Sequence, residues 1–193
     1  MKSFSLFLRY FAIFIIPICY GSFYSVFKLL LADFSVFWLC WIRMILAFVV
    51  LLPFIRNWKQ FDRSYIFPSF LLAFVFFIGL IAQSISLQFV SAGTAGFVVV
   101  SFILLTPFFA WVVFRTPLHK KLLISIVIVL IGYVVMFFQP STLTFSFQLG
   151  EFLNFIGAVV IALQIVLFEK FAPHFDTLKI TLAQFAWCSL FMT

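Results

Sequence analysis

Apolar stretches long enough to cross a bilayer recur along this chain, with only short connections between them. A helix needs about 20 mostly apolar residues to span the hydrocarbon core, and it satisfies its own backbone polar groups there. The pattern therefore predicts an all-α fold, a polytopic transmembrane helix bundle. The expected helices cover residues 10–31, 35–55, 66–87, 92–114, 121–138 and 150–170, and a seventh run from Thr177 to Thr193 is too short to span.

The composition excludes a soluble globule of this size. Hydrophobic residues make up 66% of the 193 residues and charged residues only 9%, whereas charged residues are about a quarter of an ordinary soluble chain. The net charge of +7 would indicate nucleic-acid binding only if the basic residues formed a patch on a polar surface. They lie singly or in short clusters between apolar runs, so nucleic acid is not a predicted partner.

The basic residues also predict the orientation of the chain. Eight of the twelve Lys and Arg fall in alternate connections, and the positive-inside rule assigns that side to the cytoplasm. We therefore expect a multi-pass protein of the cell inner (plasma) membrane, with a cytoplasmic N-terminus and an uncleaved first helix. The eight residues are Lys2, Arg9, Arg56, Lys59, Arg63, Arg115, Lys120 and Lys121.

Sequence patterns for catalysis or metal binding are absent. There is no nucleophile elbow, phosphate loop or HExxH motif, and Cys19, Cys40 and Cys188 lie far apart inside apolar runs. The acidic residues lie near predicted helix ends. The sequence thus predicts a protein that is not an enzyme and that needs neither a cofactor nor a metal.

Polar residues inside the predicted helices are the candidates for a substrate cavity. Arg43 is the costliest, because a charge at such depth costs at least ~2–3 kcal/mol and usually faces a bundle interior or a water-filled cavity. Trp41 and Trp38 flank it and are suited either to stacking on a substrate or to an interfacial belt. Gln83 is assigned to cavity lining, with interhelical hydrogen bonding as the alternative. Lys28 is the fourth candidate, with snorkelling as its alternative; for Arg43 the alternative is a structural contact with backbone carbonyls.

The fourth predicted helix carries features of packing and bending. Its first residues are small, and among them Gly93 and Gly96 would let helix backbones approach closely. Thr106 and Pro107 are expected to interrupt the helix, because proline cannot donate to the carbonyl four residues earlier, at Ile103. The resulting kink has two interpretations, a hinge or a simple feature of shape.

A faint internal repeat links the two ends of the chain. Lys28 is followed seven residues later by Ser35, and Lys170 seven residues later by Thr177. Each pair leads from one predicted helix into the next, but the two units enter the membrane from opposite sides. That arrangement is typical of the inverted repeats of transporters.

The chain resembles the EamA-type branch of the drug/metabolite transporter superfamily. The resemblance implies an inner-membrane carrier of ten helices in two inverted five-helix repeats, with a substrate cavity between the first four helices of each. Amino acids, drugs, polyamines and other metabolites are the substrates of that family. The matching residues are Tyr20-Gly21-Ser22, Lys28, Arg43, Ser91 to Gly96, Thr106-Pro107, Gly132, Gly150-Glu151, Ala162-Leu163 and Lys170.

On this resemblance, residues 1–140 form the first repeat and residues 141–193 an incomplete second repeat. Thr116 stands where the family often has glutamate, and the last three helices of the family are expected to be missing. The predicted function is secondary transport of a small metabolite or drug-like solute by alternating access. The predicted partners are membrane lipid and this solute, with a homodimer left open. The alternative is a truncated membrane fragment that acts only by association or has no function.

Overall fold

The computed structural model describes residues 15, 18, 21–55, 62–115, 120–139, 144–145 and 148–193. Within them the chain is an all-α bundle, as predicted, apart from a pair of two-residue antiparallel strands, β1 (Phe138–Gln139) and β2 (Thr144–Phe145). Residues 21–30 are helical. The other helices are α2 (Val36–Leu51), α3 (Ile66–Phe89), α4 (Ala92–Val99), α5 (Ser101–Phe114), α6 (Lys120–Phe137), α7 (Leu149–Phe171) and α8 (Thr177–Phe191), with 3-10 turns at Leu52–Phe54 and Arg63–Tyr65.

Four spans are long and apolar enough to cross a membrane, and they confirm four of the predicted helices. They are Val36–Phe54, Arg63–Phe89, Ala92–Phe114 and Leu149–Phe171. A shorter apolar helix, Ile124–Val135, lies within α6. The chain is therefore a multi-pass membrane protein. Most of the first half of the first predicted helix, and the connections at residues 56–61 and 116–119, lie outside the described residues.

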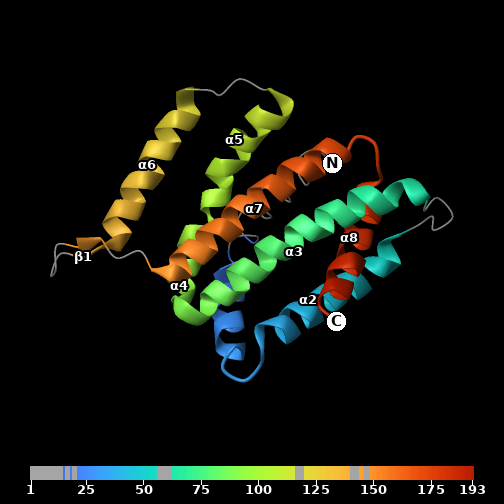
Figure 1. Cartoon of the computed structure of the whole chain (residues 1–193), viewed down its shortest axis with the longest axis horizontal. Helices are drawn as coiled ribbons and strands as arrows, with labels where there is room; N and C mark the ends of the chain where they lie inside the picture. Colours follow the sequence, from blue (N-terminus) through green and yellow to red (C-terminus); the bar gives the residue numbers. More distant parts are fainter. Residues whose placement is uncertain are drawn as a thin grey trace, which may run out of the picture.

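Helices α3 and α7 lie side by side in the middle of the bundle (Figure 1). Glycine allows their close approach: a Cβ added at Gly157 of α7 would stand 3.1 Å from the carbonyl oxygen of Gly79 in α3. Helices α4 and α5 pack against α7, and α8 packs against α2 and α3. Helix α6 is outermost (Figure 1). Helix α7, from the predicted second repeat, thus packs directly against α3, from the predicted first repeat.

The fourth predicted helix is interrupted at Val100, not at Thr106-Pro107 as expected. Pro107 lies inside α5, and the Thr106 hydroxyl before it donates to the Phe102 carbonyl at 2.6 Å. At the interruption, the Val98 carbonyl lies 2.6 Å from the Ser101 hydroxyl and 3.1 Å from the Tyr133 hydroxyl, and it accepts from one of the two while the other donates within the hydroxyl pair. In lipid a freed carbonyl needs such a partner.

The turn after residue 30 and the turn after α7 have the same pattern of backbone hydrogen bonds, with every residue number in the second turn larger by 141. The N–H of Leu31 donates to Phe27 at 3.0 Å and that of Ala172 to Phe168 at 2.9 Å. The next helices begin at equivalent N-caps, Ser35 and Asp176. The pairing expected between Ser35 and Thr177 is therefore wrong by one residue, because Asp176 supplies the capping oxygen. Two further backbone hydrogen bonds recur in the same way. The N–H of Asp33 donates to Leu30 as that of His174 does to Phe171, and the N–H of Leu39 donates to Ser35 as that of Ile180 does to Asp176.

The two turns lie at opposite ends of α3. Near the first turn, the Lys28 ammonium donates to carbonyls at the C-terminal end of α3, including that of Leu87. In the second turn, the N–H of Asp176 donates to the Tyr65 hydroxyl at 3.3 Å, and the ring of Phe175 lies 5.0 Å from that of Tyr65, just before α3 begins. The two helix–turn–helix units are thus inverted relative to α3.

Candidate functional site

Arg43 lies where α2 meets the helix of residues 21–30. The buried side of α2 carries Val36, Cys40 and Met44 at four-residue spacing, and Arg43 stands half-buried beside this row. Its guanidinium carbon lies 4.3 Å from the centre of the Phe23 ring. A cation over an aromatic face is attracted by the ring quadrupole, and more strongly when water is excluded. The contact holds the charge at the helix junction.

Gln83 reaches the same junction from α3. The Tyr24 hydroxyl donates to its side-chain oxygen at 3.4 Å, and the residue is only 7% exposed. The Gln83 side-chain nitrogen has no hydrogen-bond partner among the described residues. An amide N–H without a partner in an apolar setting is costly, so this nitrogen is a buried donor that the described residues leave unsatisfied. Beside it, the Cys40 thiol donates to the Ser84 hydroxyl at 3.2 Å.

Lys28 lies one turn beyond Tyr24, at the end of α3. Its ammonium donates to the carbonyls of Leu87, of Gln88 at 3.4 Å and of Val90 at 2.9 Å. A cation is favourable there, because the last carbonyls of a helix lack intrahelical partners and carry the negative end of its dipole. These contacts describe a helix-capping role. The cavity assignment of Lys28 stays a prediction.

Trp41 lies on a different side of α2 from Arg43. Its ring stacks on that of Trp38, with centroids 5.0 Å apart and an angle of 17° between the planes. Two positions along a helix turn a side chain by about 200°, so Trp41 and Arg43 leave α2 on different sides. Trp38 is 47% exposed, which suits the interfacial belt.

The predicted packing and bending residues lie away from this junction. A Cβ at Gly96 would meet no described atom within 4 Å, and one at Gly93 would meet only the Ser91 hydroxyl, at 3.9 Å. The small-residue start of α4 instead contacts α7 through Ala95, whose carbonyl accepts from the Asn154 side chain at 2.7 Å. The roles assigned to Gly93, Gly96 and Pro107 stay predictions.

Sequence reasoning missed Phe23, Tyr24 and the contact of Asn154. Ordinary aromatic residues in an apolar helix give no sign of which one will meet a buried cation or amide. The one available signal is spacing: Tyr24 and Lys28, like Gln83 and Leu87, are four residues apart and thus share a helix face. Among the described residues, no group of three or more His, Cys, Asp and Glu is placed to hold a metal ion.

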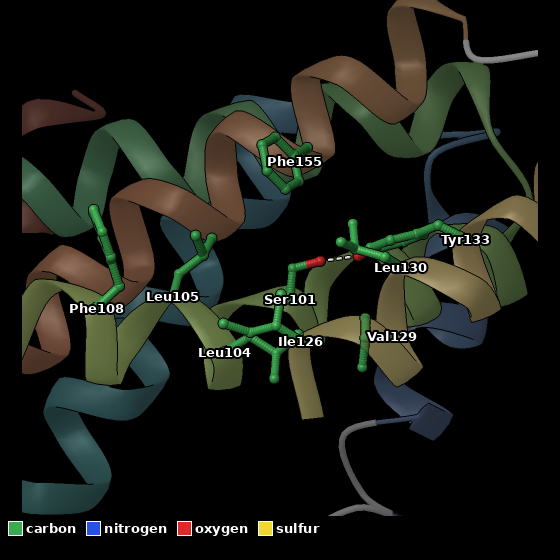
Figure 2. Close-up of a pocket in the computed structure, with 9 residues that line it drawn as sticks. All are labelled: Ser101, Leu104, Leu105, Phe108, Ile126, Val129, Leu130, Tyr133 and Phe155. Atoms are coloured by element: carbon green, nitrogen blue, oxygen red, sulfur yellow. Dashed lines mark hydrogen bonds between the residues drawn. The ribbon is translucent and has the colours of Figure 1, made fainter. Parts of the chain in front are cut away.

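A cavity of about 290 Å³ lies apart from this junction, between α5, α6 and α7 (Figure 2). Its lining is apolar except for the hydroxyls of Ser101 and Tyr133, which are hydrogen-bonded to each other. The remaining lining residues are Leu104, Leu105, Phe108, Ile126, Val129, Leu130 and Phe155.

Apolar spans with a half-buried arginine and an unpaired amide between them define an integral membrane protein. The sequence pattern of the EamA-like transporter family matches residues 8–138, and the chain belongs to this family. An uncharacterized transporter of Archaeoglobus fulgidus is 23% identical over 158 residues, which cover 82% of this chain and 48% of the relative. The chain thus spans about half the length of this curated relative. No solved structure matches it significantly.

Proposed function

We propose that this protein is a secondary transporter that moves a small metabolite or drug-like solute across the cell inner membrane by alternating access. The observation that carries the proposal is Arg43, a cation half-buried within a span. Such residues are expensive in a bilayer and mark substrate or ion pathways. The chain's membership of the EamA-like transporter family agrees with a role in transport. The proposed orientation, with the N-terminus in the cytoplasm, follows from the basic connections.

The chemistry of the junction favours a solute with an anionic or hydrogen-bond-accepting group. The guanidinium of Arg43 offers several fixed N–H donors, and the unpaired nitrogen of Gln83 adds another. Phe23 and Tyr24 supply aromatic surface beside these donors. We assign Arg43 to electrostatic recognition and Gln83 to hydrogen bonding of the solute.

The inverted turns at the two ends of α3 support the proposed mechanism. Carriers built from inverted repeats open alternately to each side when one repeat rocks against the other around a site at mid-membrane. Residues 1–140 and 141–193 are the parts that we assign to the two repeats. The competing proposal is a membrane protein that does not transport and acts only by association.

An unbiased flux measurement tests transport. Liposomes containing the purified chain, and matched protein-free liposomes, are incubated with a pooled extract of low-mass cell metabolites. Mass spectrometry then quantifies the solutes inside. We expect at least one small solute to enter the protein-containing liposomes faster. Identical profiles in both preparations, with the protein folded and inserted, would favour the non-transporting protein.

A further inference from the structure

Helices α3 and α7 pack along one seam in antiparallel register. A Cβ added at Gly157 of α7 would stand 2.5 Å from the Gln83 side chain of α3, and one added at Gly150 would stand 2.6 Å from the Val90 side chain. Gly150 lies seven residues before Gly157, and Val90 lies seven residues after Gln83. A step forward along α3 is therefore matched by an equal step back along α7.

This register places Asn154 of α7 opposite Ser86 of α3. Asn154 lies three residues before Gly157 and Ser86 three residues after Gln83, so both belong to the next layer of the seam. Asn154 and Ser86 are both 0% exposed. Side chains three residues apart on a helix are neighbours, with Cβ atoms about 5–6 Å apart. The side chains of Gln83, Ser86 and Asn154 thus start within one helical turn of one another.

The polar atoms of these three side chains are complementary. Asn154 donates through its side-chain nitrogen to the Ala95 carbonyl, and its side-chain oxygen has no partner among the described residues. The Gln83 side-chain nitrogen likewise has none among them. The Ser86 hydroxyl donates its hydrogen to the Gln83 carbonyl at 2.7 Å, which leaves its oxygen as an acceptor. The seam therefore offers one N–H donor and two acceptor oxygens, all of them buried.

A water molecule matches this set of groups. Buried water typically makes about three hydrogen bonds to groups that are otherwise unsatisfied, and it can donate twice while it accepts from an N–H. One water spans about 5–6 Å between the two heavy atoms that it joins, which is the spacing of neighbouring side chains on this seam. We propose that one buried water bridges α3 and α7. It accepts from the Gln83 nitrogen and donates to the side-chain oxygens of Asn154 and Ser86.

The bridge would join the two proposed repeats beside the close approach at Gly157. It does not rest on the proposed transport function. An amide nitrogen carries two hydrogens, so the water uses one N–H of Gln83 and the solute contact proposed above keeps the other. Loss of the water would leave buried polar groups without partners on both helices, which is costly in an apolar setting.

A crystal structure of the full chain in a lipidic mesophase, at a resolution that shows ordered water, tests the site directly. We expect one water within about 3.2 Å of the Gln83 nitrogen, the Asn154 side-chain oxygen and the Ser86 oxygen. A direct hydrogen bond between the Gln83 and Asn154 side chains would overturn the proposal. So would the absence of water from this place.

A double-mutant cycle in detergent tests the same bridge, with Ser69 as the matched control. Ser69 is also a serine of α3 that is 0% exposed, and its hydroxyl donates to the Tyr65 carbonyl at 2.6 Å. It lies 17 residues before Ser86, which places it about 25 Å away along the helix. Ser69→Ala therefore removes a comparable hydroxyl without touching the proposed water.

The effect of each serine substitution is measured as the unfolding temperature of the parent chain and of Asn154→Leu. Asn154→Leu removes one acceptor of the water, so Ser86→Ala should lower the unfolding temperature much less in this background than in the parent. Ser69→Ala should have the same effect in both, because distant sites act additively. Equal effects of Ser86→Ala in both backgrounds would contradict the bridge. The crystal structure needs no variant, so it tests the proposal even if Asn154→Leu does not fold.

Discussion

Replacing Gly157 by alanine is expected to lower the free energy of unfolding by about 1–3 kcal/mol, because it overpacks the centre of the bundle. The added Cβ would stand 2.5 Å from the Gln83 side chain, 3.1 Å from the Gly79 carbonyl oxygen and 3.2 Å from the Gln83 backbone nitrogen. Two of these atoms belong to the backbone of α3 and cannot rotate away. Helices α3 and α7 must then separate, which weakens the contact that joins the two proposed repeats.

Gly96→Ala is the matched control for this substitution. Gly96 also lies inside a helix, but its added Cβ would meet no described atom within 4 Å. Alanine is favoured over glycine in a helix by up to about 1 kcal/mol, so this variant should be as stable as the parent or slightly more so. Thermal unfolding of the detergent-solubilised proteins compares the two. Equal stability of both variants would show that α3 and α7 do not pack as closely as described.

Replacing Arg43 by alanine is expected to reduce solute flux by about tenfold or more, the effect of losing roughly 1.4 kcal/mol of charged interaction. The guanidinium is the half-buried cation at the junction of α2 with residues 21–30, and alanine leaves no donor there. The liposome assay, with a solute that the parent protein accumulates, measures the change. Arg63→Ala, at an exposed position before α3, should retain flux.

A stability measurement distinguishes recognition from a structural role for Arg43. If the arginine mainly holds Phe23, Arg43→Ala should lower the unfolding temperature and the amount of inserted protein together with flux. If it recognises the solute, the variant should insert and unfold like the parent and yet lose flux, and a raised KM should account for much of the loss. Unchanged flux in a normally inserted variant would remove Arg43 from the site.

The positions of the helices could be predicted because length and hydropathy decide them in lipid. The start of α3 at Ile66 and that of α4 at Ala92 agree with the expected boundaries, and α7 differs by one residue at each end. Local capping adds to this: Ser35 and Ser91 each accept a hydrogen bond from the first turn of the helix that follows. Neither effect depends on a distant part of the chain.

The contacts between helices could not be predicted in the same way, because they depend on which face each residue occupies. Gly157 and Gly79 form the close approach, although Gly93 and Gly96 belong to a denser run of small residues. At the interruption, the Val98 carbonyl meets the hydroxyl of Tyr133, which comes from another helix. In a uniformly apolar helix, the hydrophobic pattern does not show which side faces lipid and which faces protein.

The central claim is that the two helix–turn–helix units enter the membrane from opposite sides, as an alternating-access carrier requires. Asp33 and His174, at equivalent positions in the two turns, are both exposed. Single cysteines placed there, in a chain with Cys19, Cys40 and Cys188 replaced by alanine, can be labelled in sealed vesicles with a membrane-impermeant maleimide. We predict that one position reacts only from outside and the other only after the vesicles are opened. Labelling of both positions from the same side would contradict the inverted arrangement.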